Sequence, residues 1–167
     1  MKRDRRFHVH IRNSARAVMI NERGEMLLFK FAFHRRDGSK TLWVTPGGGL
    51  EEGESFEEAL RREIFEETGV MLDEIGPWIW TKEMRFEGDG QPFLSHERYY
   101  LVMVAGYEPE LDNMTDAEKG TLKDCKWWSA EELRQSADRE PFSIAGLDRL
   151  LAEINAGMIP PQPVRID

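Results

Sequence analysis

The chain has a single cysteine and no long apolar run, and each of these shortages excludes a class of protein. Its 167 residues include only Cys125 as a thiol, so an internal disulfide is excluded. No apolar stretch approaches the roughly 20 residues that a membrane-spanning helix needs. The basic N-terminal residues are not followed by the apolar core of a secretory signal. We therefore expect a cytoplasmic protein without a membrane partner.

Positive charge is also scarce over the chain as a whole. The formal net charge is −8, which disfavours general binding to nucleic-acid backbones, so we do not expect nucleic acid as a partner. Residues 51–67 carry much of the acidity, with eight glutamates against two arginines. The opening segment is basic instead, and either steers an anion or is an ordinary solvated terminus. Its basic residues are Lys2, Arg3, Arg5, Arg6, Arg12 and Arg16.

The length and the hydrophobic content of 40% suit one domain over residues 1–167, with a core of its own. Residues 1–10 form a basic N-terminal segment, and residues 158–167 a proline-containing extended tail. Hydrophobic periodicity predicts strands alternating with two or three helices, and therefore an α/β sandwich with a mixed sheet. The predicted strands are Ala15 to Ile20, Glu25 to Phe33, Thr41 to Thr45, Trp78 to Arg85, Glu97 to Ala105 and Lys126 to Ser129.

One predicted helix, from about Ser55 to Thr68, follows a glycine-rich turn and has clear start and stop signals. Ser55 and Glu58 have the spacing of a capping box, and Gly69 stands where a C-cap glycine is expected. Two further helices are predicted, one from Ala130 and a final one that includes residues 144–154.

Glutamates fall on the apolar side of the first helix. At about 100° per residue, Glu63 and Glu67 project into the same arc as its apolar residues, and Glu66 lies at the margin of that arc. A solvated charged face, the usual role of a glutamate-rich helix, would place them on the opposite side. Two carboxylates about 5 Å apart repel by roughly 3 kcal/mol at an effective dielectric constant near 20. Such a cluster needs protons or cations.

The donor atoms indicate which cation to expect. Carboxylate oxygens without a neighbouring histidine or cysteine suit Mg²⁺, with Mn²⁺ as a substitute. These ions usually share their remaining coordination positions with water and substrate phosphates. The sequence therefore predicts a magnesium site with room for a phosphate-bearing substrate.

The segment Gly48 to Val70, GGLEEGESFEEALRREIFEETGV, resembles the signature G-x5-E-x7-R-E-U-x-E-E-x-G-U of the Nudix hydrolases, in which U is a bulky aliphatic residue. Every fixed position matches. The matching residues are Gly48, Glu54, Arg62, Glu63, Ile64, Glu66, Glu67, Gly69 and Val70. The resemblance sharpens the expected fold to the Nudix α/β/α sandwich. It also implies a Mg²⁺-dependent pyrophosphohydrolase, in which water attacks a phosphorus of a nucleoside diphosphate linked to another moiety X.

The resemblance also implies roles for individual residues. By position, Glu63, Glu66 and Glu67 are expected metal ligands, one of which also assists deprotonation of water. The backbone carbonyl of Gly48 is a further expected ligand, and glycine there also permits close backbone approach.

Two more site residues follow from the resemblance. Glu54 and Arg62 are expected to pair and to hold the loop against the helix. Similar proteins often place another catalytic or metal-binding glutamate in a loop before the late strand, which makes Glu118 in the segment Leu111 to Leu122 a candidate. A solvated loop acid is the competing interpretation of Glu118.

The substrate and the assembly stay open at this level. ADP-ribose, other nucleotide sugars, dinucleoside polyphosphates and nucleoside triphosphates all fit the signature, because the X group is left to loops such as His34 to Lys40 and Phe86 to Ser95. The rival functions are a noncatalytic nucleotide-sensing module on the same fold and a pyrophosphohydrolase of RNA 5′ ends. Monomer and homodimer are both compatible with the sequence.

Other candidates have weaker support. Trp43 precedes the glycines and either stacks on a base or packs in the core. Glu97 or Arg98 contacts substrate if its side of the strand faces the site. His8 and His10 share one face of an extended segment but lack a third zinc ligand at suitable spacing.

Overall fold

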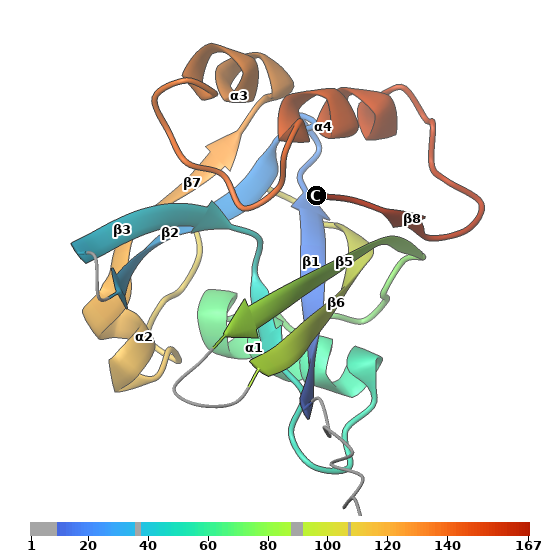
Figure 1. Cartoon of the computed structure of the whole chain (residues 1–167). Coiled ribbons are helices and arrows are strands. Elements are labelled where there is room, and N and C mark those ends of the chain that lie inside the picture. The colour runs from blue at the N-terminus through green and yellow to red at the C-terminus, as the bar shows by residue number, and fades with distance from the viewer. Residues whose placement is uncertain (1–9, 36–37, 88–91, 107) are drawn as a thin grey trace, which may run out of the picture.

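The computed structural model describes residues 10–35, 38–87, 92–106 and 108–167, and shows a sheet with helices on both faces (Figure 1). The strands are β1 His10–Ile20, β2 Met26–Arg35, β3 Gly38–Val44, β4 Gly47–Gly49, β5 Trp78–Glu87, β6 Pro92–Met103, β7 Leu122–Trp128 and β8 Val164–Arg165. The helices are α1 Phe56–Thr68, α2 Asp116–Thr121, α3 Ala130–Ser136 and α4 Leu147–Asn155.

The sheet is mixed. Its strand order is β3-β2-β1-β6-β5-β8, with β4 paired to β1 and β7 paired to β2. Strand β1 runs parallel to β6 along its whole length, from the pair His10 and Phe93 to the pair Ile20 and Met103, and antiparallel to the short β4. Figure 1 shows α3 and α4 together at one side of the sheet and α1 and α2 at the other. The predicted α/β/α sandwich with a mixed sheet is confirmed.

Apolar side chains from β1 fill both faces of the sheet. Val18 and Ile20 belong to the core cluster that includes residues of α3 and α4. Ala17 and Met19 belong to the cluster that includes Leu60 and other residues of α1. A strand covered on both sides reads as an almost continuous apolar run rather than as an alternating one. Strand β1 is therefore buried at the centre of the sheet, and the short strand β4 pairs with it.

Several predicted loops are strand or helix in the structure. Strands β5 and β6 pair as far as Glu87 and Pro92, and the rings of Phe86 and Phe93 stack with centroids 5.1 Å apart. The expected loops His34 to Lys40 and Phe86 to Ser95 therefore consist largely of strand, except for residues 36–37 and 88–91, which lie outside the described residues. Helix α2 likewise lies within the expected loop Leu111 to Leu122.

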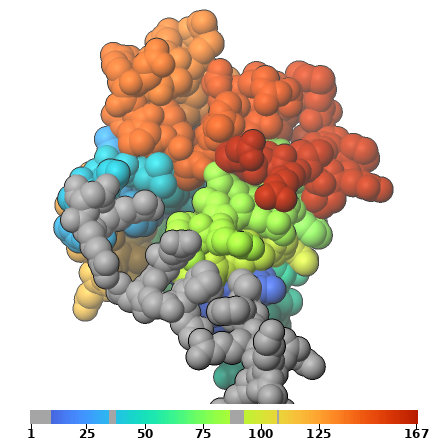
Figure 2. All heavy atoms as spheres, in the orientation of Figure 1, coloured from blue at the N-terminus to red at the C-terminus, as the bar shows by residue number. Residues whose placement is uncertain are grey.

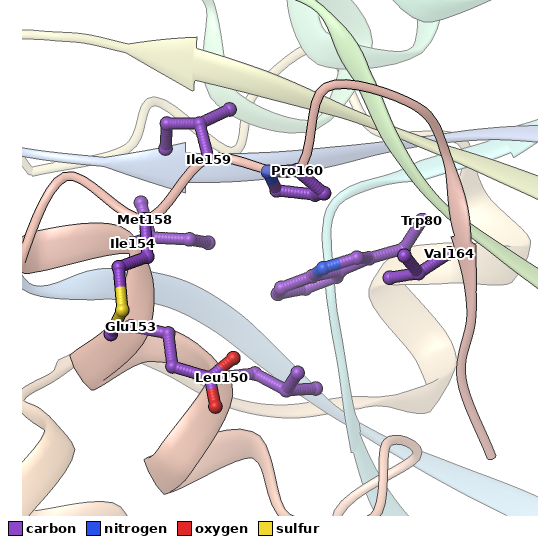
Figure 3. Close-up of a pocket in the computed structure, with 8 residues that line it drawn as sticks. All are labelled: Trp80, Leu150, Glu153, Ile154, Met158, Ile159, Pro160 and Val164. Carbon is purple, nitrogen blue, oxygen red and sulfur yellow. The ribbon is translucent and has the colours of Figure 1, made fainter.

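The C-terminal segment, predicted to be an extended tail, ends in a short strand that joins the sheet. After Pro163, strand β8 pairs in parallel with β5, and the Ile166 amide donates to the Thr81 carbonyl at 2.9 Å. Figure 3 shows side chains of this segment and of α4 around the indole of Trp80, which comes from β5. They line a cavity of about 270 Å³. The burial of Ile166 and the pairing with β5 hold the segment at the sheet edge.

Residues 1–9, including the predicted His8, lie outside the described residues. Among the helices of the described ranges, none has the length and apolar character that crossing a bilayer requires.

Replacing Ile166 with alanine should destabilise the fold. Its side chain is 8% exposed within the core, and truncation of a buried isoleucine usually lowers the free energy of unfolding by about 2 kcal/mol or more. Urea unfolding measures this difference. Val164→Ala is the matched control, because Val164 is 44% exposed and its truncation should cost less than about 1 kcal/mol. Equal effects of the two substitutions would contradict a structural role for the C-terminal strand.

Candidate metal centre

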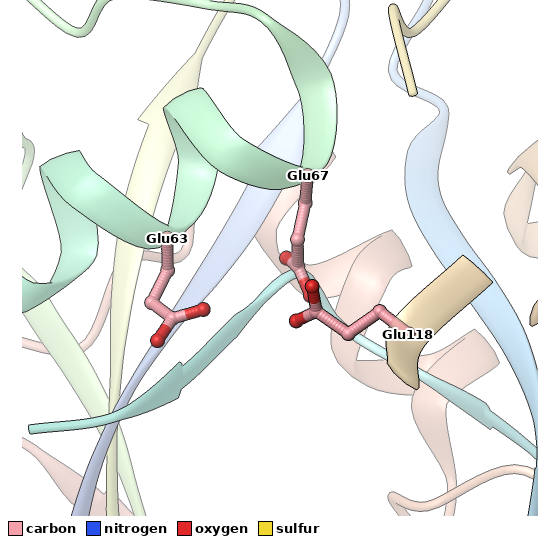
Figure 4. Close-up of side chains that lie close together, drawn as sticks. All are labelled: Glu63, Glu67 and Glu118. Atoms are coloured by element: carbon pink, nitrogen blue, oxygen red, sulfur yellow. The ribbon is translucent and has the colours of Figure 1, made fainter. Parts of the chain in front are cut away.

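Two elements far apart in the sequence bring carboxylates together. Oxygens of Glu63, Glu67 and Glu118 all lie within 4.8 Å of one another. Figure 4 shows Glu63 and Glu67 descending from α1, and Glu118 reaching from α2 toward the Glu67 carboxylate. The cluster is therefore assembled by packing α1 and α2 on the same side of the sheet.

Helix α1 begins and ends where its sequence signals predict. The Ser55 hydroxyl accepts from the Glu58 amide while the Glu58 carboxylate accepts from the Ser55 amide, and Gly69 closes the helix with φ of 76°. Glu63 and Glu67 are four positions apart in the helix, so both side chains lie on one face, 8% and 3% exposed respectively. The inward orientation predicted for these two glutamates is confirmed.

Glu67 is the most buried carboxylate of the cluster. Its Oε2 accepts a hydrogen bond from the Gly47 amide at 2.6 Å. Burial raises the pKa of Glu67 to about 8, and the negative charges of Glu63 and Glu118 add to that rise, although the Gly47 amide and Arg16 act against it. Without a cation the cluster therefore holds a proton at neutral pH.

Glu63 depends on the absence of a side chain at Gly48. A Cβ atom on Gly48 would lie 2.6 Å from the Glu63 carboxylate, well inside van der Waals contact. Burial raises the pKa of Glu63, against the opposing effect of the Arg62 guanidinium that donates to its Oε1 at 2.7 Å. Glycine at position 48 thus lets the backbone of β4 come directly against a buried carboxylate.

Arg62 ties the glycine turn to the helix. Its Nε and Nη2 donate to the two oxygens of Glu54 at 2.7 and 2.8 Å, and Nη2 also donates to the Gly49 carbonyl at 3.0 Å. Hydrogen bonding to Arg62 lowers the pKa of Glu54 to about 2. The expected contact between Glu54 and Arg62 is therefore present, in the bidentate form that arginine makes with carboxylates.

The composition of the cluster differs from the predicted ligand set. Glu66 is half-buried, and its Oε2 lies 3.6 Å from Arg62 Nη1 rather than in the group formed by the other three carboxylates. Glu118 is in that group, although its Oε2 also accepts from the Thr115 amide in the capping box of α2. The role of Glu66 as a ligand stays a prediction, as does that of the Gly48 carbonyl.

The cluster fits a hard divalent cation. All three donors are carboxylates, and the described chain holds no other group of at least three acidic, histidine or cysteine ligands so arranged. Glu67 is largely removed from water, and glycine at position 48 lets the backbone lie directly beside the Glu63 carboxylate. Oxygen-only coordination of this kind suits Mg²⁺ or Mn²⁺ rather than zinc.

A cavity of about 410 Å³ lies beside the glycine turn, on the opposite face of the sheet from the α1 core. Gly48 and Gly49 line it, which connects it to the carboxylate cluster. In the space-filling view of Figure 2, the orange and red C-terminal segments lie above the green surface of β5 and β6, and Ser143 of the orange segment contributes to the lining. The apolar lining is Phe33, Leu42, Val44, Met84, Phe86 and Phe93, and the charged lining is Arg12, Arg16, Lys82 and Glu97.

The secondary candidates separate into those that face this cavity and those that do not. Trp43 is 2% exposed, and its ring lies edge-on to Trp128 at 5.0 Å, so the suggestion that it stacks on a base is wrong. Glu97 lines the cavity, whereas Arg98 lies between the rings of Phe56 and Trp78. Whether Glu97 contacts substrate stays a prediction.

Two cavity residues received no site role from their sequence context. Arg16 was grouped with the basic N-terminal residues, yet it is a half-buried partner of Glu97. Lys82 is buried and donates to the Ser143 carbonyl at 2.6 Å. Side chains alternate between the two faces along β1 and β5, so the sequence indicates that each residue lies on the same face as buried residues of its own strand. Only the fold shows that this face borders a cavity.

Known proteins share both the sequence pattern and the fold. A profile of the NUDIX domain family matches residues 10–150. The nucleoside triphosphatase NudI of Salmonella paratyphi B is 32% identical over 137 residues, which make up 77% of this chain and 93% of that protein. NudI of Escherichia fergusonii has the same identity and coverage. Among solved structures, the MutT NUDIX hydrolase from Burkholderia pseudomallei has a TM-score of 0.59 at 21% identity, covering 86% of this chain and 97% of that chain.

The pKa of Glu67 generates a test of the cluster in metal-free protein. Because the native pKa is raised to about 8, the native state keeps a proton that the unfolded state loses above about pH 4.5. The free energy of unfolding should therefore fall as the pH rises from about 5 to 8, and Glu67→Gln should remove this part of the slope. Urea unfolding in chelator at several pH values measures it.

The matched control for this experiment is Glu52→Gln, because Glu52 is exposed and lies outside the cluster. That variant should retain the wild-type pH dependence. If Glu67→Gln also retained it, the carboxylate would not be buried as described.

Proposed function

We propose, from the premise that this chain belongs to the NUDIX domain family of hydrolases, that it hydrolyses nucleoside triphosphates in a Mg²⁺-dependent reaction. As a member of that family it is a pyrophosphohydrolase, acting on phosphoric anhydride bonds of a nucleotide derivative. The observation that supports the proposal best is the junction at Gly48, where the cavity and the carboxylate cluster meet.

The arrangement suits a nucleotide that lies across this junction. A cavity of about 410 Å³ with aromatic and aliphatic walls has room for a base and its sugar. The phosphates would then extend over Gly48 and Gly49 toward Glu63. Arg12 lines the cavity on the same side, and its exposed guanidinium suits a phosphate oxygen.

The carboxylates have distinct tasks in this proposal. Glu63, Glu67 and Glu118 would hold the cation, and Glu66, which pairs with Arg62 at 3.6 Å, is a further candidate ligand. A divalent cation, when bound, neutralises phosphate charge and favours deprotonation of the attacking water. Glu118 is the least buried of the three clustered carboxylates, which makes it our candidate for accepting the proton of that water. Arg62 and Glu54 keep the glycine turn against α1 while this occurs.

Nucleoside triphosphates are the favoured substrate class because the relatives that align over 93% of their own length are named nucleoside triphosphatases. ADP-ribose and other nucleotide sugars are the competing substrates, since the carboxylate cluster would act on any diphosphate bridge. We favour catalysis over a noncatalytic nucleotide-sensing role because every carboxylate of the signature is retained. The net charge of −8 also argues against RNA ends as the main substrate.

The cellular location and the domain organisation are also part of the proposal. We propose a cytoplasmic location, because the single cysteine, Cys125, is a free thiol and needs no oxidising compartment. We also propose that residues 1–167 form one domain, since both core clusters pack on the same sheet.

The direct test is an assay of pyrophosphate and phosphate release from a panel of substrates. The panel contains the ribo- and deoxyribonucleoside triphosphates, ADP-ribose and a dinucleoside polyphosphate, each with Mg²⁺, with Mn²⁺ and with chelator. We expect turnover of triphosphates that chelator abolishes. Turnover in chelator would contradict the metal dependence, and a preference for ADP-ribose would contradict only the substrate class.

Removing a cluster carboxylate should abolish most of the turnover. Glu67→Gln keeps the shape of the side chain but removes its charge, so kcat should fall at least about 100-fold while the fold is kept. Glu118→Gln should lower kcat by a similar factor. Glu74→Gln, at an exposed position outside the cluster, is the control and should retain wild-type turnover. Near-normal activity of the Glu118 variant would contradict a role for Glu118 in metal binding or catalysis.

A further inference from the structure

A continuous chain of hydrogen bonds runs from the cavity to the metal-binding carboxylates. The Tyr99 hydroxyl donates to Glu97 Oε2 at 2.6 Å, and Arg16 donates to Glu97 Oε1 from Nε at 3.1 Å and from Nη2 at 3.0 Å. On its other side, Arg16 Nη1 donates to the Gly47 carbonyl at 2.8 Å. The Gly47 amide in turn donates to Glu67 Oε2 at 2.6 Å. The backbone of Gly47 therefore links Arg16 to the Glu67 carboxylate.

We infer that Arg16 is a positioning residue for the cation site, which holds the Gly47 backbone, and through it Glu67, in the geometry that metal binding needs. This inference rests on the proposed function, because it concerns the same cluster. It assigns Arg16 an indirect role, in which the guanidinium acts through the glycine turn rather than on the substrate.

The strand that carries Gly47 is held by its pairing with β1, by the Arg62 contact to the Gly49 carbonyl and by Arg16. Strand β4 is three residues long and pairs with β1 alone among the described strands, with Arg16 opposite Gly47. Gly47 has φ of 123°, and a Cβ atom there would lie 2.1 Å from the Ala15 carbonyl oxygen. The position therefore accepts no side chain that could anchor the turn by itself. The guanidinium of Arg16 provides that anchor from the neighbouring strand.

The fork of an arginine is required for this contact. Its nitrogens reach the Glu97 carboxylate on one side and the Gly47 and Thr45 carbonyls on the other. A lysine has a single ammonium group and cannot hold both sides in the same fixed geometry. Replacement of Arg16 by lysine therefore keeps the charge but loses the connection between β6 and β4.

Glu97 and Tyr99 fix the direction in which Arg16 points. Glu97 is 6% exposed and Tyr99 is 2% exposed, so neither has water as its main partner. Removing one member of a buried ion pair leaves the other charge uncompensated, which is costly. Glu97→Gln should therefore loosen Arg16, although position 16 itself is unchanged.

Direct binding of substrate by Arg16 is the competing role, because Arg16 lines the cavity with a side chain that is 22% exposed. Against it, every nitrogen of the guanidinium already donates to the protein. The two roles differ in what they change. Positioning alters cation affinity and kcat, whereas direct contact alters the KM for the nucleotide.

The experiment compares wild type with Arg16→Lys and Glu97→Gln. Binding of Mn²⁺ without substrate is measured from the electron paramagnetic resonance signal of the free ion, and kcat and KM are measured over a range of Mg²⁺ concentrations. We expect the Kd for Mn²⁺ to rise about 10-fold or more in both variants, as is typical when a partner of a metal ligand is removed. We also expect kcat to fall, a nearly constant KM, and partial recovery of kcat at high Mg²⁺.

The matched control is Arg23→Lys, because Arg23 forms an exposed ion pair with Glu25 away from the cluster and should show wild-type Mn²⁺ binding. Thermal unfolding shows whether each variant is folded. If Arg16→Lys does not fold, Mn²⁺ binding by Glu97→Gln still tests the positioning role of Arg16. Unchanged Mn²⁺ affinity in a folded variant, with a raised KM, would overturn positioning in favour of substrate contact. Absence of Mn²⁺ binding by the wild type would instead overturn the proposed function, and this inference with it.

Discussion

The site depends on the close approach of three like-charged carboxylates in a poorly hydrated place. Glu63, Glu67 and Glu118 lie within 4.8 Å of one another, and burial raises the pKa of Glu67 to about 8. At such distances two ionised carboxylates repel by roughly 3 kcal/mol at an effective dielectric constant near 20, and this repulsion contributes to the raised pKa of Glu67. The fold holds the carboxylates together through a capped helix and a glycine turn. A divalent cation bound among them, as we propose, would offset the repulsion.

The glycine turn at β4, which packs between β1 and α1, is where these constraints meet. Gly47 lies against the backbone of β1, and Gly48 lies against the Glu63 carboxylate, so neither position has room for a Cβ atom. Arginines hold the turn from both sides, Arg62 from the helix and Arg16 from the sheet. The same turn borders the cavity. If substrate and cation bind as proposed, a few backbone atoms of this turn would connect the two sites.

The sequence alone predicted the features that depend on local spacing. The limits of α1 and the inward orientation of Glu63 and Glu67 follow from cap residues and helical periodicity within the signature segment. The contact of Glu54 with Arg62 was expected from the resemblance to the Nudix signature, and it is present. The mixed sheet between helices was also predictable from the order of apolar segments.

Features that depend on long-range packing were not predictable. The orientation of Glu118 depends on how α2 packs near α1, and the buried position of Trp43 depends on Trp128 and Glu140. The C-terminal segment was expected to be an extended tail because its prolines disfavour regular structure, whereas its pairing with β5 depends on a distant strand. The role of Arg16 could not be read from a basic cluster without knowing that its neighbours are Glu97 and Gly47.

The most direct test of the central claim is a crystal structure of the protein soaked with Mn²⁺, with anomalous diffraction used to locate the ion. We expect an anomalous peak between α1 and α2, bounded by oxygens of Glu63, Glu67 and Glu118. A protein saturated with Mn²⁺ whose only peak lay away from these three carboxylates would contradict it.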